Sequence, residues 1–121
     1  MENDYAIFRL ADVYLMKAEA LVRSGLSNAT ATELVNAIRK RAFTDPSKLL
    51  NQVTLDDIYK ERRFEFAWEL VSRQDMIRFG TFLNPIPGPV GRGAIDATRL
   101  IYPIPRTAID ANPGLTQNPG Y

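Results

Sequence analysis

Helical periodicity ends at Gly80, and this break constrains the fold more than any other feature of the chain. Before it, apolar residues recur at three- and four-residue spacings that predict packed helices. After it, proline and glycine interrupt every segment, beginning with residues 80–94, which hold three prolines and four glycines. We therefore expect an all-α fold with a long irregular C-terminal tail. At 121 residues, the chain (1–121) fits a single domain.

Residues 1–46 read as a helical hairpin. The first helix is expected from about Asp4 to Ser24, with Gly25 as its C-terminal stop. Apolar residues cover most of its circumference, so neighbours on two sides are expected. The second helix is expected over residues 29–42, with a basic C-terminal turn that complements the helix dipole.

Residues 54–80 read as a further pair of packed helices. The third helix begins at Thr54, with Asp57 completing an approximate capping box, and continues to about Leu70. Its two sides are both apolar, which predicts a helix sandwiched between neighbours; one side carries Ile58, Tyr59, Arg62, Phe66 and Leu70, and the other Phe64, Ala67, Trp68 and Val71. A shorter helix is expected over 73–79.

Residues 81–121 form a loop and then a tail that we expect to wrap over the helices, because the tail is too poor in apolar periodicity to form a core. Residues 102–105 should be extended, and 107–110 could form one helical turn. Two Asn-Pro-Gly sequences, at 112–114 and 118–120, indicate turns.

Composition excludes several classes of function. The chain has no cysteine and no histidine, so disulfides, cysteine nucleophiles and Cys/His zinc sites are absent. A net charge of +1 gives no sign of the strong positive charge that nucleic-acid-binding domains carry. We find no signal peptide and no membrane span, and we expect no cofactor and no catalytic activity.

The hairpin carries an approximate tetratricopeptide pattern. Tyr14, Ala18 and Leu21 lie on the first helix, and Ala31 and Val35 on the second. The small residues would let the two helices approach closely, although a generic helical hairpin explains the pattern equally well. A single repeat cannot bury its own faces, so neighbours outside this chain are implied, and the isolated chain should self-associate.

Three further motifs resemble the SusD/RagB family. They are Glu61–Glu69 (ERRFEFAWE) with Arg73–Gly80 (RQDMIRFG), the terminal stretch Tyr102–Tyr121, and Arg9–Ala20 (RLADVYLMKAEA) at the entry to the last repeat hairpin. The resemblance covers nearly the whole chain except residues 81–99. Two positions depart from the family pattern, which often has Gly at Leu70 and Arg at Ser72.

The resemblance implies a C-terminal portion of an outer-membrane lipoprotein that faces outward. Such proteins bind oligosaccharides or other nutrients and cover a TonB-dependent (SusC-like) transporter, without catalysis. The ligand would be bound largely by segments outside this chain, which also lacks the family's lipid-bearing cysteine. The alternative is a stand-alone tetratricopeptide-like domain for protein interaction, without a sugar site.

The carboxylates of the third helix could in principle serve glycoside hydrolysis, because Glu61, Glu65 and Glu69 share one edge. They form a row beside abundant arginine, which favours a structural ion-pair network instead. Arg62 falls within an apolar stripe, and a buried charge needs a partner. We assign this network to Glu19, Arg62, Glu65, Glu69, Asp75 and Arg78.

Other candidate sites are weaker. Tyr59 and Trp68 could stack on sugars, but their spacing favours the core, whereas Tyr102 and Tyr121 should be partly exposed. Gly88–Gly93 resembles a phosphate loop but lacks the Lys-Ser/Thr that should follow. We treat the sequon at Asn28 as coincidence.

Overall fold

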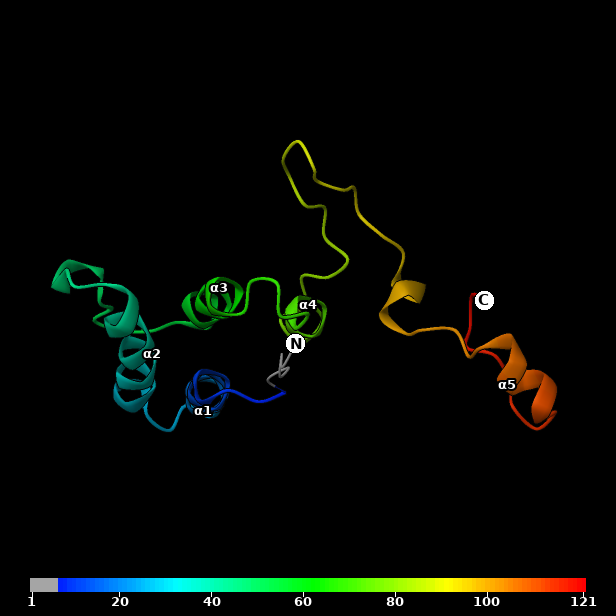
Figure 1. Cartoon of the computed structure of the whole chain (residues 1–121), viewed down its shortest axis with the longest axis horizontal. Helices are drawn as coiled ribbons and strands as arrows, with labels where there is room; N and C mark the ends of the chain where they lie inside the picture. The colour runs from blue at the N-terminus through cyan, green and yellow to red at the C-terminus, as the bar shows by residue number, and fades with distance from the viewer. Residues whose placement is uncertain (1–6) are drawn as a thin grey trace, which may run out of the picture. The chain divides into compact units, whose positions relative to one another are not determined.

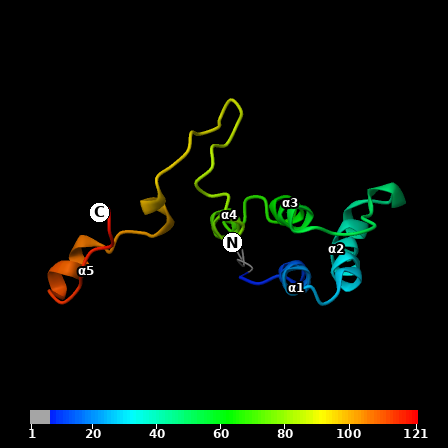
Figure 2. The ribbon, with the colours of Figure 1, turned by 180° about the vertical axis from the view of Figure 1, so that it is seen from behind.

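The computed structural model describes residues 7–121, which form five α-helices, two short 3-10 helices and no β-strand (Figure 1). The expected all-α class is confirmed. The chain divides into two compact units, 1–72 (unit 1) and 73–121 (unit 2). Figure 2 shows the same elements from behind.

Unit 1 is built around the pair formed by α1 (Leu10–Ser24) and α2 (Asn28–Ala42). Ala18 and Ala31 are completely buried, as the close approach of the two helices requires. Gly25 ends α1 in the left-handed conformation, at φ 68°, and Ser27 caps α2 by accepting a hydrogen bond from the Thr30 N–H. The hairpin and its stop at Gly25 are confirmed.

The first helix begins later than expected. Residues 7–9 are not helical, and the part of the expectation that falls on residues 4–6 lies outside the described residues. Arg9 has an extended backbone and precedes the first turn. Its guanidinium bonds to Glu65 and Glu69, which holds this segment against the end of the third helix instead of in a further turn of α1.

The link between α2 and the next helix is fastened by a polar stripe on α2. Asn28 donates to the Val53 carbonyl, Thr32 accepts from the Val53 N–H, and Asn36 both donates to and accepts from Leu50. The four-residue spacing places the three side chains on one face of the helix. The link itself contains only the 3-10 helix η1 (Pro46–Lys48).

The third helix, α3 (Leu55–Glu65), packs on α1 and is shorter than expected. Its capping box is present: Thr54 accepts from the Asp57 N–H, and Asp57 accepts from the Thr54 N–H. The expected continuation to Leu70 is wrong, because Phe66 leaves the helical conformation and both Trp68 (φ 69°) and Leu70 (φ 62°) are left-handed. Phe64 is 76% exposed, so the described residues leave its side of α3 uncovered, and the expected covering of both faces stays a prediction.

Unit 2 contains α4 (Ser72–Arg78) from its second residue onward, the 3-10 helix η2 (Ala97–Leu100) and α5 (Arg106–Ala111). Gly80 ends α4, at φ 72°, where it was expected to. The extended stretch 102–105 is held by Gln117, which accepts from the N–H of Ile104 and donates to its carbonyl. That the tail wraps over the helices, and that 1–121 is one domain, stay predictions.

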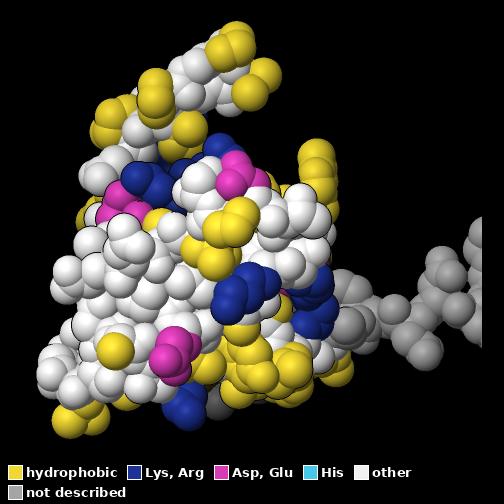
Figure 3. Space-filling model, turned by 90° about the vertical axis from the view of Figure 1, so that its left-hand side faces the viewer, with side chains coloured by type: hydrophobic (Ala, Val, Ile, Leu, Met, Phe, Trp, Pro, Cys, Tyr) yellow, Lys and Arg dark blue, Asp and Glu magenta, His cyan; other side chains and the backbone are white. Residues whose placement is uncertain are grey.

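The surface combines charged and apolar side chains. On the face that Figure 3 shows, basic, acidic and hydrophobic side chains are interspersed, without a large patch of one charge. Along α1, Leu10, Val13 and Met16 are exposed and form an apolar edge. Self-association of the isolated chain through such surfaces stays a prediction, which light scattering can check. Among the described residues, no helix combines the length and apolarity needed to cross a membrane.

Candidate functional site

Arg9 clamps the end of α3 to the start of α1. Its terminal nitrogens donate to a Glu65 carboxylate oxygen and to the Glu65 carbonyl, each at 2.9 Å, and Nε and a terminal nitrogen donate to the two Glu69 oxygens at 2.9 and 2.8 Å. The guanidinium also lies over the Phe66 ring, 4.8 Å from its centre. One planar cation therefore fixes both ends of the 65–69 turn.

The clamp changes the ionisation of its members. The hydrogen bond to Glu69 raises the pKa of Arg9 above its ordinary value. Burial acts to raise the pKa of Glu65, but hydrogen bonds from Arg41 and Arg9 outweigh it, so the pKa of Glu65 lies below its ordinary value. Glu65 is therefore held as a carboxylate.

The structure places every member of the expected ion-pair network in an ion pair. Glu19 pairs with Arg23 at 2.8 Å, Asp75 with Arg78 at 2.7 Å, and Glu65 and Glu69 with Arg9. Arg62 is buried and bonds to Asp12 at 2.7 Å, a partner that was not among those expected. That these six residues form a single network stays a prediction.

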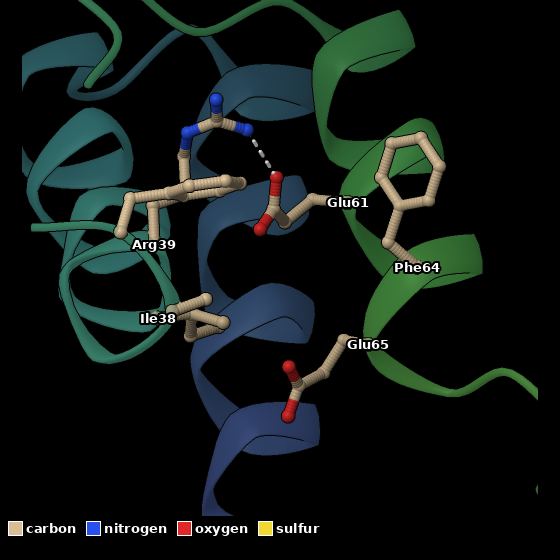
Figure 4. A pocket seen from close by; sticks show the side chains of 7 residues that line it. Ile38, Arg39, Glu61, Phe64 and Glu65 are labelled. Atoms are coloured by element: carbon tan, nitrogen blue, oxygen red, sulfur yellow. Dashed lines mark hydrogen bonds and ion pairs between the residues drawn. The ribbon is translucent and has the colours of Figure 1, made fainter. Parts of the chain in front are cut away.

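A small pocket lies between the C-terminal half of α2 and α3. Its volume is about 260 Å³, and its lining comes from both helices: Ile38, Arg39, Ala42, Phe43, Glu61, Phe64 and Glu65. Arg39 donates to Glu61 across the gap at 2.6 Å. Figure 4 shows Glu61 and Glu65 pointing from α3 toward α2, while Phe64 points away from them.

The turn after α3 exposes its aromatic residue. Trp68 is 100% exposed, so the expectation that it belongs to the core is wrong, whereas Tyr59 is buried as expected. The error followed from extending the helical periodicity beyond Glu65, where the Arg9 clamp has already ended the helix. Tyr102 and Tyr121 are exposed as expected, and the Tyr121 hydroxyl donates to the carbonyls of Thr98 and Ile101.

The glycine-rich loop does not form a phosphate cradle. Ile86 and Arg92 pair through both backbone hydrogen bonds, and the Gly91 N–H donates to the Gly88 carbonyl. Gly91 is required here, because a Cβ would lie 2.1 Å from the Ile86 carbonyl oxygen. At Asn28, the side-chain nitrogen of the sequon donates to Val53. Within residues 7–121, no three acidic side chains gather to hold a metal ion.

Sequence reasoning missed Arg9, Asp12, Arg39 and Arg41 as ion-pair partners. Each lies far along the chain from its partner, so no local spacing marks the contact. The Asn28-Thr32-Asn36 stripe could have been found, because its regular spacing on one face is visible in the sequence.

The whole of this chain, residues 1–121, matches the model of the SusD family. The chain belongs to the SusD family. Among curated SusD-family relatives, it is 36% identical to the starch-binding protein SusD of Bacteroides thetaiotaomicron, over 99% of this chain and 22% of the relative. It is 35% identical to SusD-like protein P25 of Formosa agariphila, over 93% of this chain and 23% of that protein.

Solved structures agree with this membership. The fold is similar to surface glycan-binding protein A from Bacteroides thetaiotaomicron, with a TM-score of 0.76 and 31% identity, over 97% of this chain and 25% of that one. The same protein solved in complex with laminarihexaose also gives a TM-score of 0.76, at 32% identity, over 96% of this chain and 25% of that one. This SusD-family chain thus spans about a quarter of the length of the relatives it matches.

Proposed function

We propose that this chain is the C-terminal part of a cell-surface, glycan-binding lipoprotein that works with a TonB-dependent outer-membrane transporter. The observation that carries the proposal is the family match over residues 1–121, together with relatives named for binding starch and surface glycans. These relatives favour it over a stand-alone tetratricopeptide-like domain without a sugar site.

The role is binding without catalysis. A glycosidase needs a carboxyl group that stays protonated near neutral pH, which requires a raised pKa. Glu65 has the opposite shift, because two arginines stabilise its carboxylate. Glu61 is paired with Arg39, and Glu69 with Arg9. The three glutamates that could have formed an acid–base pair thus serve to join helices.

Most of this segment provides a frame for the glycan site. Its buried charges and polar stripe tie α1, α2 and α3 to one another, as a rigid support for a binding surface requires. Since the chain covers about a quarter of its relatives, most glycan contacts would come from the other segments of the protein.

Affinity electrophoresis tests the binding role directly. The full-length protein should migrate more slowly in native gels that contain starch or laminarin, and an unrelated protein of similar size should not. Unchanged migration across a panel of glycans would contradict glycan binding. Release of reducing sugar by the purified protein, abolished by Glu61→Gln or Glu65→Gln, would contradict the absence of catalysis.

A separate experiment tests the transporter. The tagged full-length protein, extracted from outer membranes in mild detergent, should co-purify with a TonB-dependent transporter. Proteinase K added to intact cells should degrade it, as expected for a lipid-anchored protein on the outer surface. Recovery without a transporter, or full protection from the protease, would contradict this part of the proposal.

A further inference from the structure

The pocket between α2 and α3 has the size of a single small ring and not of a long ligand. Its volume of about 260 Å³ lies just below the range of roughly 300–1,000 Å³ that encloses drug-sized molecules. Its lining includes two pairs of residues spaced four positions apart, Ile38 and Ala42 on α2 and Glu61 and Glu65 on α3. Figure 4 shows Glu61 and Glu65 pointing toward the helix that carries Ile38. Both helices are fixed, because each is fastened by ion pairs.

One side of the pocket is apolar and includes an aromatic ring. Ile38 and Ala42 provide aliphatic surface, and Phe43 is 42% exposed. The Arg39 guanidinium lies 5.3 Å from the centre of the Phe43 ring and covers one of its faces. The other face can therefore receive an apolar surface, and the ring is held in place by its stacking on Arg39.

The other side of the pocket presents a carboxylate, Glu61, that Arg39 holds in place. Arg39 donates from Nε to the Lys48 carbonyl and from one terminal nitrogen to Glu61, and Glu61 accepts through Oε2. Among the hydrogen bonds of the described residues, neither the second terminal nitrogen of Arg39 nor Oε1 of Glu61 takes part. Oε1 of Glu61 therefore remains able to accept a hydrogen bond from a hydroxyl group.

The charges of the lining select a neutral ligand. Glu61 and Glu65 would repel a phosphate or a carboxylate, while Arg39 and Arg41 already compensate these two carboxylates and leave little attraction for a cation. A molecule with hydroxyl groups around its edge and C–H groups on its face matches both sides of the pocket.

We propose that this pocket binds one pyranose ring of a glycan, with the C–H face of the sugar on the free face of Phe43 and a hydroxyl group that donates to Glu61. The proposal rests on the proposed function, because it adds a second contact for the same glycan. It also assigns part of the glycan recognition to this segment, in addition to the main binding surface elsewhere in the protein.

Calorimetric titration of the full-length protein tests the contact. Phe43→Leu keeps the apolar volume but removes the ring, and Trp68→Ala is the matched control, an exposed aromatic outside the pocket. With laminarihexaose or maltohexaose, whichever the wild type binds, Phe43→Leu should raise Kd roughly three- to tenfold. Trp68→Ala should leave Kd within twofold, and circular dichroism should show both variants folded.

Three results would overturn the proposal. An unchanged Kd in Phe43→Leu would show that the ring does not contact the glycan and would leave the proposed function intact. A raised Kd in Trp68→Ala, with an unchanged Kd in Phe43→Leu, would place the glycan contact at the 66–70 turn. A wild type that binds no glycan would contradict the proposed function and this site together.

A direct measurement uses a single sugar. In the full-length protein with 13C-labelled phenylalanine, methyl β-glucoside at millimolar concentrations should shift the Phe43 ring signals, assigned by their loss in Phe43→Leu. Arg39→Lys keeps the charge but loses the planar group that stacks on the ring and holds Glu61, and should weaken this response. Ring signals of Phe43 that do not move, while other phenylalanine signals do, would contradict a ring bound in this pocket.

Discussion

The two units of the chain are held together in different ways. All the buried apolar residues among those described lie in unit 1, between Ala11 and Phe66. In unit 2, only Asp75 is buried, and the loops are tied by polar side chains to backbone carbonyls. The comparison teaches that one family segment can combine an apolar core with a part fixed mainly by hydrogen bonds and arginine stacking.

Arg73 is the central side chain of unit 2, the part that is fixed mainly by hydrogen bonds and arginine stacking. Its guanidinium lies 4.2 Å from the centre of the Tyr102 ring and 4.9 Å from that of Phe82, and it donates to the Arg99 carbonyl at 2.7 Å. Its counterpart in unit 1 is Leu15, which is fully buried and makes its contribution through packing alone. Substitutions in the two units should therefore have different effects on stability.

Leu15→Ala should have the largest effect. It leaves a cavity in the core of unit 1 and should lower the free energy of unfolding by about 2–5 kcal/mol. The matched change Leu100→Ala, at a partly exposed leucine of unit 2, should cost less than about 1 kcal/mol. Denaturant titration of both variants measures the difference, and equal losses would contradict the contrast.

Arg73→Lys should loosen unit 2 while unit 1 stays intact. Lysine keeps the charge but loses the planar fork and the stacking on two rings, at a cost of about 1–2 kcal/mol. Hydrogen exchange at the amides of Ile101 and Ile104 should accelerate roughly 5–30-fold. The exposed Arg99 provides the control, and Arg99→Lys should leave these rates unchanged; a uniform acceleration throughout the chain would contradict a local role.

Leu70→Gly should stabilise unit 1 slightly. Leu70 has a left-handed backbone, at φ 62°, which costs a non-glycine residue roughly 1 kcal/mol, and its side chain is exposed. Glycine removes this strain but gains freedom in the unfolded chain, so we expect a net gain of about 0.5 kcal/mol. Leu70→Ala removes the same side chain and keeps the strain. A thermal midpoint that rises for both variants, or for neither, would contradict the interpretation.

Glu65→Gln should change the pH dependence of unit 1. Because the folded-state pKa of Glu65 is lowered, its stabilisation is fully present above its unfolded pKa of about 4.3 and is lost as the pH falls through the lower, folded value. The variant should therefore lose less stability than the wild type below about pH 5. Glu33→Gln, at an exposed glutamate, is the control. Parallel acid-unfolding curves for wild type and Glu65→Gln would contradict the clamp's electrostatic role.

By itself, the sequence determined the all-α class, the α1–α2 hairpin, the stops at Gly25 and Gly80, and the capping box at Thr54. These features depend on residues a few positions apart, and local chemistry decides them. The family motifs, also local, identified the SusD family.

Only the tertiary structure decided where α1 begins, where α3 ends and which side chains face solvent. Arg9 ends up beside Glu65 and Glu69, some 56 and 60 residues away in the chain, and this contact stops α3 before the apolar spacing does. Trp68 is exposed for the same reason. The α2–α3 pocket likewise combines side chains whose approach depends on helix packing, which no pattern along one helix can specify.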